Sequence, residues 1–351
     1  MTLIILILIL GLLIFVHELG HFIFAKKTGV YVYEFALGMG PKIFSFKRKN
    51  KKDPTVYSLR LLPIGGFCAM AGEVLEDDED KKIKKHQFMC NKSKLERFLI
   101  LAAGVTFNFC LALLLLFFQS LIWGHTEQKA IIGNVPEGYP IHEAGIEVGD
   151  KVLELNGYKI NSWDKLTIVL NLKNKKDSYD FKIKKKDGTI KKYIITPTLE
   201  KNEDGKEVKV FGIGAGDKIY KGFIPSLKYA FTKFWSIIYT MAMIIGALFT
   251  GKLGLNSLSG PVGMYQVVGE TAKYGMQSLI YLTAYLSVNL GFINAIPFPA
   301  FDGGRVVFIG IEAITKKKIN TKLEGTLHTI GFILLMLLML YVTILDIIKL
   351  F

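Results

Sequence analysis

Residues 3–25 read LIILILILGLLIFVHELGHFIFA, an almost entirely apolar run that is followed by a pair of lysines. An apolar run of this length predicts a helix that crosses a membrane. The only ionisable side chains within it are His17, Glu18 and His21. Because residues four apart share one face of a helix, both imidazoles should point the same way, with the Glu18 carboxylate beside them.

This spacing is the H-E-x-x-H arrangement, in which two imidazoles bind a zinc ion and the carboxylate acts on the zinc-bound water. An ionisable side chain inside a membrane costs about 2.5–3.5 kcal/mol on insertion scales and usually marks function. Three such groups on one span are difficult to explain by packing, so the motif predicts a site for one zinc ion. The apolar residues 3–16 rise about 21 Å, which places the site past the middle of a hydrocarbon core about 30 Å thick.

The composition is 51% hydrophobic and 21% charged, with a net charge of +14. This mixture predicts a membrane protein that carries a soluble part. The basic residues lie largely in loops beside apolar spans, which is a topology signal, so we expect membrane lipid and no nucleic acid as a partner. The first span has neither a basic n-region nor a small-residue cleavage site, and we expect it to stay as an anchor. Neither a disulfide framework nor a cysteine zinc site is predicted by the spacing of Cys68, Cys90 and Cys110.

Residues 1–125 are expected to hold the first two transmembrane helices and the loop between them. The positive-inside rule assigns this lysine-rich loop to the cytoplasm. Within it, residues 56–67 have the composition of a strand that ends at a glycine pair, Gly65 and Gly66.

The second span, residues 98–123, carries Gly104 and Asn108, four residues apart on one face. A small residue and an amide in this spacing suit close helix packing with one buried hydrogen bond. We therefore expect Asn108 to act in packing rather than in chemistry.

Residues 126–216 are expected to form a domain of short strands, interrupted by one helical segment at 164–172. The segment Ala144-Gly-Ile-Glu-Val-Gly149-Asp150-Lys-Val-Leu-Glu-Leu-Asn156-Gly157 resembles the core of a PDZ domain. By that resemblance, the module would accept a peptide ligand as an added strand. The alternative is a β-domain without a ligand.

Residues 217–351 are expected to contain an interfacial helix region and the last two transmembrane helices. Residues 231–249 could either span the membrane or lie in its interface. Residues 279–301 are expected to form an apolar helix that Asp302 closes, and residues 330–350 are expected to form the final span.

The metal constrains the topology. A catalytic zinc ion commonly has three protein ligands, and the first span offers two. Asp302, followed by two glycines that allow the backbone to turn, can supply the third only if residues 279–301 run from the outside towards the cytoplasm. The β-rich domain is already outside, so residues 231–249 must not cross. Four crossings satisfy this constraint, whereas five would leave Asp302 at the outer face.

The chain resembles the site-2 protease family of intramembrane zinc metalloproteases, in particular the bacterial branch of the regulator of sigma-E protease. The resemblance runs nearly end to end. It is carried by the H-E-x-x-H motif, the G-x-x-x-N span, the PDZ-like core and Asn294-Ala-Ile-Pro297-Phe-Pro299-Ala-Phe-Asp302-Gly303. It implies a multi-pass α-helical protein of the bacterial cytoplasmic (plasma) membrane. The fold would include an extracytoplasmic PDZ-like domain and a membrane-associated β-element on the cytoplasmic side.

By the same resemblance, the zinc ligands are His17, His21 and Asp302, and Glu18 is the catalytic carboxylate. An unwound substrate would be held by Asn294, Pro297, Pro299 and the strand at Gly65 and Gly66. Structural support would come from Gly104, Asn108 and Asn289. Two departures from the family pattern, Val105 for Pro and Phe301 for Leu, remove no ligand and affect only helix packing.

The resemblance implies a zinc endopeptidase that cuts transmembrane segments of single-span membrane proteins, such as pre-trimmed anti-sigma factors or signal-peptide remnants. One alternative is a non-proteolytic membrane scaffold, with a PDZ-like domain and a structural zinc site closed by a fourth ligand. Another is a protease of soluble peptides, which would favour a motif near the interface and a downstream Glu. No fourth ligand is evident, and ordinary surface positions are expected for His86, His125, His142 and His328.

Overall fold

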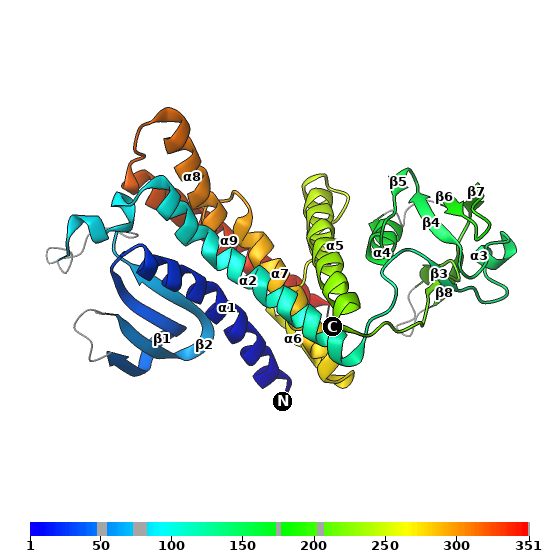
Figure 1. Ribbon diagram of the computed structural model, residues 1–351, viewed down its shortest axis with the longest axis horizontal. Helices are drawn as coiled ribbons and strands as arrows, with labels where there is room; N and C mark the ends of the chain where they lie inside the picture. The colour runs from blue at the N-terminus through cyan, green and yellow to red at the C-terminus, as the bar shows by residue number, and fades with distance from the viewer. Residues whose placement is uncertain (48–54, 73–82, 173–176, 202–206, 350–351) are drawn as a thin grey trace. The chain divides into compact units, whose positions relative to one another are not determined.

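The chain divides into two compact units, Met1–Leu115 with Leu255–Phe351 and Leu116–Gly254. The computed structural model describes residues 1–47, 55–72, 83–172, 177–201 and 207–349 (Figure 1). Helix α2 (Lys94–Trp123) continues from the first unit into the second. The three-part division at residues 125 and 216 stays a prediction.

The first unit is built mainly from helices and one sheet. Its helices in the described residues are α1 (Thr2–Lys27), the start of α2, α6 (Pro261–Lys273), α7 (Met276–Ala295), α8 (Asp302–Thr315) and α9 (Thr321–Ile348), with the short 3-10 turns η2 (Lys85–Gln87), η3 (Met89–Asn91) and η4 (Leu255–Ser257). Helix α1 covers the predicted first span. It is apolar on all sides but buries only one face, which carries Leu13, His17 and His21, while Leu8 and Leu12 are exposed. A helix of this kind is typical of a membrane span whose outer face contacts lipid.

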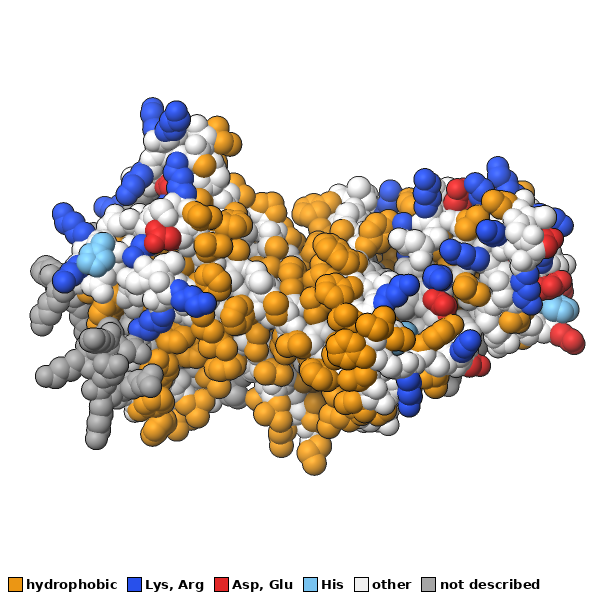
Figure 2. Space-filling model, viewed as in Figure 1, with side chains coloured by type: hydrophobic (Ala, Val, Ile, Leu, Met, Phe, Trp, Pro, Cys, Tyr) orange, Lys and Arg blue, Asp and Glu red, His pale blue; other side chains and the backbone are white. Residues whose placement is uncertain are grey.

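Five helices are long and apolar enough to cross a membrane: α1, α2, α5 (Phe223–Phe249), α7 and α9. Four of them coincide with the predicted spans, and α5 is the additional candidate. Figure 2 shows hydrophobic side chains exposed over the helices and charged side chains scattered over the β-rich unit. Length and composition do not separate a spanning helix from an interfacial one, so the number of crossings stays a prediction.

A bent sheet formed by β1 (Val32–Lys47) and β2 (Val56–Met70) packs beside α1. Both strands bend back along their length, so that Phe35 of β1 pairs with Cys68 on one side and with Tyr57 on the other, near the two ends of β2. Among the described residues, the segment 66–70 of β2 therefore lies at one edge of the sheet.

The predicted end of this strand at Gly65 and Gly66 is wrong. Both glycines lie inside β2, which continues to Met70. Gly65 has a φ of +91°, a left-handed conformation that glycine adopts without a steric penalty. The strand therefore changes direction at the glycine pair without ending there.

The second unit contains short strands and two longer helices. In the described residues these elements are β3 (Ile132–Asn134), α3 (Pro140–Glu143), β4 (Lys151–Leu155), β5 (Tyr158–Lys159), α4 (Trp163–Leu172), β6 (Tyr179–Lys184), β7 (Ile190–Ile195), β8 (Thr198–Lys201), β9 (Glu207–Val210), β10 (Gly214–Ala215) and α5. The main sheet has the order β5-β4-β6-β7. Its buried residues, such as Val152, Leu155 and Phe181, form a core with residues from α4. The helical segment predicted at 164–172 corresponds to α4.

Candidate metal centre

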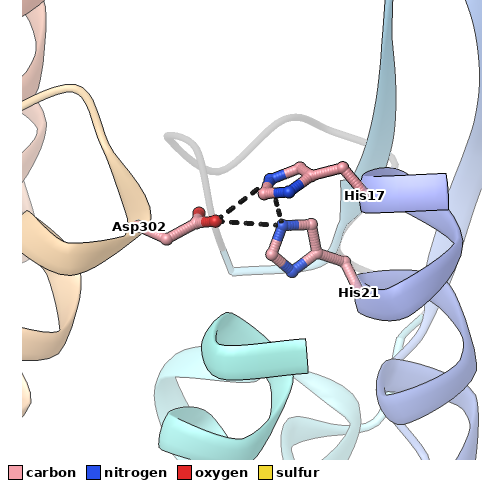
Figure 3. Close-up of side chains that lie close together, drawn as sticks. All are labelled: His17, His21 and Asp302. Atoms are coloured by element: carbon pink, nitrogen blue, oxygen red, sulfur yellow. Dashed lines mark hydrogen bonds and ion pairs between the residues drawn. The ribbon is translucent and has the colours of Figure 1, made fainter. Parts of the chain in front are cut away.

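Three side chains from distant parts of the sequence meet in the first unit (Figure 3). His17 and His21 lie one turn apart on α1, and Asp302 is the first residue of α8. The Asp302 Oδ2 atom lies 3.1 Å from His17 Nε2 and 3.3 Å from His21 Nε2, and the two Nε2 atoms are 3.2 Å apart. No other group of three or more His, Cys, Asp or Glu residues in the described ranges could hold a metal ion.

This triangle fits a zinc ion. With bonds of about 2.0–2.1 Å and tetrahedral angles, zinc holds neighbouring ligand atoms about 3.3–3.4 Å apart. Asp302 Oδ2 is buried and, apart from the imidazoles that face it, has no hydrogen-bond partner in the described residues. Two imidazole nitrogens and a carboxylate oxygen at this spacing form a donor set that suits a zinc ion. The described residues add no fourth ligand to the group, so a tetrahedral ion would keep one position open, as catalytic sites do.

Hydrogen bonds on the far side of each ring set the imidazole orientations. His21 Nδ1 lies 2.9 Å from the backbone oxygen of Ile100. Because a carbonyl only accepts, Nδ1 carries the proton and Nε2 is left for a metal. The side-chain amide of fully buried Asn108 lies 3.3 Å from His17 Nδ1, and Ser287 Oγ donates to the backbone oxygen of Asn108 over 2.8 Å. Asn108 therefore contacts a predicted ligand as well as linking α2 to α7.

Glycines bring α1 and α2 together at the centre. A Cβ atom on Gly20 would lie 2.5 Å from the backbone oxygen of Ala103, and one on Gly104 would lie 2.5 Å from His21 Nε2 and 2.8 Å from His17 Cε1. Any side chain at position 104 would occupy the space that the two imidazoles need. The G-x-x-x-N spacing thus serves the metal centre directly.

The path of the chain into Asp302 differs from the prediction. Helix α7 ends at Ala295, and a connection of residues 296–301 separates it from α8. Asp302 therefore begins a helix, and the expectation that it closes the preceding one is wrong. The glycines after it are helical, and their role is close packing. A Cβ on Gly303 would lie 2.3 Å from the oxygen of Ile296, and one on Gly304 would lie 2.3 Å from the oxygen of Phe298.

A cavity of about 540 Å³ surrounds the three side chains. Its wall includes Glu18, Asn294 and Arg305, and β2 contributes Gly65 and residues 67–70. A carboxylate next to the predicted metal ligands can accept a proton during hydrolysis, and a strand along the cavity can pair with an extended peptide.

Comparison with known proteins agrees with this geometry. Residues 5–338 match the family described as Peptidase family M50. The chain belongs to this family. It is 34% identical to zinc metalloprotease RasP of Bacillus licheniformis over 427 residues, covering 100% of this chain and 99% of that protein. It is 32% identical to the regulator of sigma-W protease RasP of Bacillus subtilis over 425 residues, covering 100% and 99%.

Membership of family M50 confirms the resemblance to site-2 proteases and makes the chain a zinc metalloprotease and an integral membrane protein. It favours the enzyme over the non-proteolytic scaffold. Of the predicted substrate-binding residues, Gly65 and Asn294 line the cavity. Gly66 lies close to Glu18, since a Cβ built on it would be 3.6 Å from Glu18 Cγ. Pro297 and Pro299 lie in the connection to α8, and Asn289 is on α7 with a buried Oδ1 that has no hydrogen-bond partner among the described residues. The roles assigned to all these residues stay predictions.

Two histidines expected at ordinary surface positions are integrated into the structure. His328 Nδ1 accepts the backbone N–H of Ala300 over 2.9 Å. His125 stacks on Tyr229, with ring centroids 4.5 Å apart, and its Nδ1 lies 2.7 Å from Ser120 Oγ. His86 and His142 are exposed, as predicted. No sequence pattern marked His328, because its partner is a backbone group 28 residues away.

Proposed function

We propose that this M50 protease hydrolyses peptide bonds within or near the transmembrane segments of single-span membrane proteins. One observation supports the proposal above all. The predicted ligands and Glu18 line one cavity, which lies past the middle of the apolar helix α1. An edge segment of the β1–β2 sheet forms part of the cavity wall. A protease of soluble peptides has no need for a centre at this depth.

The predicted ligands His17, His21 and Asp302 would hold the zinc ion, which when bound polarises the scissile carbonyl and lowers the pKa of a water to about 7. Glu18 accepts the proton of the attacking water and delivers it to the leaving amine. The Ile100 carbonyl and the Asn108 amide keep the imidazoles oriented while this occurs.

A transmembrane helix shields its own peptide bonds, so the substrate must unwind before cleavage. Residues 67–70 of β2 border the cavity and can pair with an extended substrate strand. The Asn294 side chain lies on the same cavity and can replace hydrogen bonds that the substrate helix loses. We propose anti-sigma factors already trimmed outside the membrane, or signal-peptide remnants, as substrates. The name of the Bacillus subtilis relative, regulator of sigma-W protease, supports the first class.

The test is the substitution Glu18→Gln, which removes the proton acceptor but no predicted zinc ligand. We expect purified E18Q to contain zinc at the wild-type level and to leave a tagged single-span reporter uncut. Glu270→Gln, at an exposed position on α6, is the matched control and should cut the reporter normally. Normal turnover by E18Q would remove Glu18 from the mechanism.

We further propose four crossings, with the β-rich unit outside the cytoplasm, acting as a PDZ-like filter against bulky ectodomains. The contacts of α5 support this topology. The carboxylate of Asp164 on α4 accepts hydrogen bonds from Lys233 Nζ, at 2.7 and 2.8 Å, and from Ser236 Oγ, at 2.8 Å. Lys165 Nζ lies 4.3 Å from the ring centroid of Tyr239. A helix whose middle binds charged groups of a soluble domain is favoured in the interface over the bilayer core.

Accessibility of the two ends of α5 tests this topology. Single cysteines at the exposed positions Lys218 and Lys252, in a chain whose three native cysteines are replaced by serine, are treated in whole cells with a membrane-impermeant maleimide. Labelling of both positions is expected. Labelling of only one would mean that α5 crosses the membrane.

A further inference from the structure

The connection between α7 and α8, residues 296–301, ends directly at Asp302 and has a complete set of partners for its backbone N–H groups. Two of its six residues are prolines, which have no backbone N–H group. The N–H groups of Ile296, Phe298 and Phe301 donate to nearby backbone oxygens of Ile293, Ile296 and Phe298. The N–H of Ala300 alone donates to a side chain, His328 Nδ1 on α9, over 2.9 Å.

This hydrogen bond acts on a strained residue. Ala300 has a φ of +86°, in the left-handed region that residues with a Cβ rarely adopt. Such a conformation persists only where surrounding contacts hold it. Here α9 approaches closely, because a Cβ on Gly331 would lie 2.4 Å from the oxygen of Pro299. The ring of His328 is itself fixed by an edge contact with Phe308, with centroids 5.9 Å apart.

Only Phe301 separates Ala300 from Asp302, so the backbone at Ala300 sets where α8 begins and where its first carboxylate points. The Asp302 Oδ2 atom must keep its 3.1 and 3.3 Å distances to the two imidazoles. Metal–ligand distances in zinc sites vary by only about 0.2 Å. A relaxation of Ala300 towards an ordinary φ would move the carboxylate by more than this.

We propose that His328 is a positioning residue of the metal centre. Its neutral Nδ1 accepts the Ala300 N–H, holds the left-handed turn and thereby keeps Asp302 in place for the metal. The inference rests on the proposed zinc ligands, and it adds a contribution of α9 to a centre whose predicted ligands lie on α1 and α8.

Two substitutions at one position test whether the acceptor matters. His328→Phe keeps a flat ring but has no acceptor, whereas His328→Asn places an amide oxygen near the position of Nδ1. Full-length protein in detergent is titrated with zinc in a chelator buffer, and the unfolding midpoint is measured without zinc. Because loss of a supporting hydrogen bond typically costs 10–100-fold in metal affinity, we expect H328F to bind zinc about tenfold more weakly than wild type. H328N should lie within about twofold of wild type.

The outcomes separate this inference from the zinc site itself. Wild-type zinc affinity in H328F, or equal weakening in H328N and H328F, overturns the role of His328. Asp302→Ala is measured in parallel and should lose zinc binding. If D302A binds zinc normally, the proposed ligand set fails instead. His328→Leu, which also lacks an acceptor, replaces H328F if that variant has a lower unfolding midpoint without zinc, and wild-type zinc affinity in it likewise overturns the proposal.

Discussion

Substitution of Gly104 by alanine gives a sharp test of the metal centre. The added Cβ would lie 2.5 Å from His21 Nε2, 2.7 Å from His21 Cε1 and 2.8 Å from His17 Cε1. Ordinary carbon contacts are about 3.5–4.0 Å, so at least one imidazole must move by about 1 Å. That displacement is about five times the variation of about 0.2 Å seen in zinc–ligand distances.

We expect Gly104→Ala to weaken zinc binding by about 100-fold, the upper end of the range for disturbed supporting residues. This factor corresponds to about 2.7 kcal/mol. Zinc affinity is measured by competition with a chelator and zinc content by elemental analysis of the purified protein. Cleavage of a single-span reporter should fall with the zinc content.

Gly11→Ala on α1 is the matched control, because a Cβ there meets no atom within 4 Å. Alanine is a better helix former than glycine by up to about 1 kcal/mol, so G11A should fold and bind zinc like wild type. If G104A binds zinc with wild-type affinity, Gly104 does not pack against metal ligands and the proposed centre is wrong.

Two further predictions concern stability. In the buried ion pair between α2 and α8, Arg97 Nη1 lies 2.6 Å from Glu312 Oε2. Leaving one buried partner unpaired costs about 3–5 kcal/mol, so Glu312→Ala should lower the free energy of unfolding by this amount in detergent, whereas Glu270→Ala at an exposed pair should change it little. A small effect of E312A would show that the pair contributes little. For Glu34, burial raises the pKa, but this is outweighed and the pKa lies below its ordinary 4.5 because of hydrogen bonds from Ser58, Lys42 and Arg60. The ionised form therefore stabilises the sheet above pH 4.5, and this contribution is lost as the pH falls below that value. Glu34→Gln should lose less stability than wild type between about pH 5 and pH 3, and equal losses in denaturation curves would contradict the assignment.

The sequence alone was sufficient for the parts of the structure that depend on local pattern. The length of the apolar run predicted α1, and the four-residue spacing predicted that His17 and His21 share a face, since both follow from helix geometry. Motif resemblance named Asp302, and the structure brings it to both imidazoles although it is 281 residues from His21. The same motif resemblance predicted the class of enzyme, a zinc protease.

Only the tertiary structure decided how Asp302 is delivered, because that depends on backbone contacts between distant segments. The helix break at residues 296–301, the left-handed Ala300 and its bond to His328 leave no periodic signal in the sequence. Gly104 could be read as a packing residue, but its contact with both imidazoles required the placement of α2 against α1. Hydrophobic periodicity specifies which face of a helix is buried, whereas the approach of one backbone to another is set by the whole packed unit.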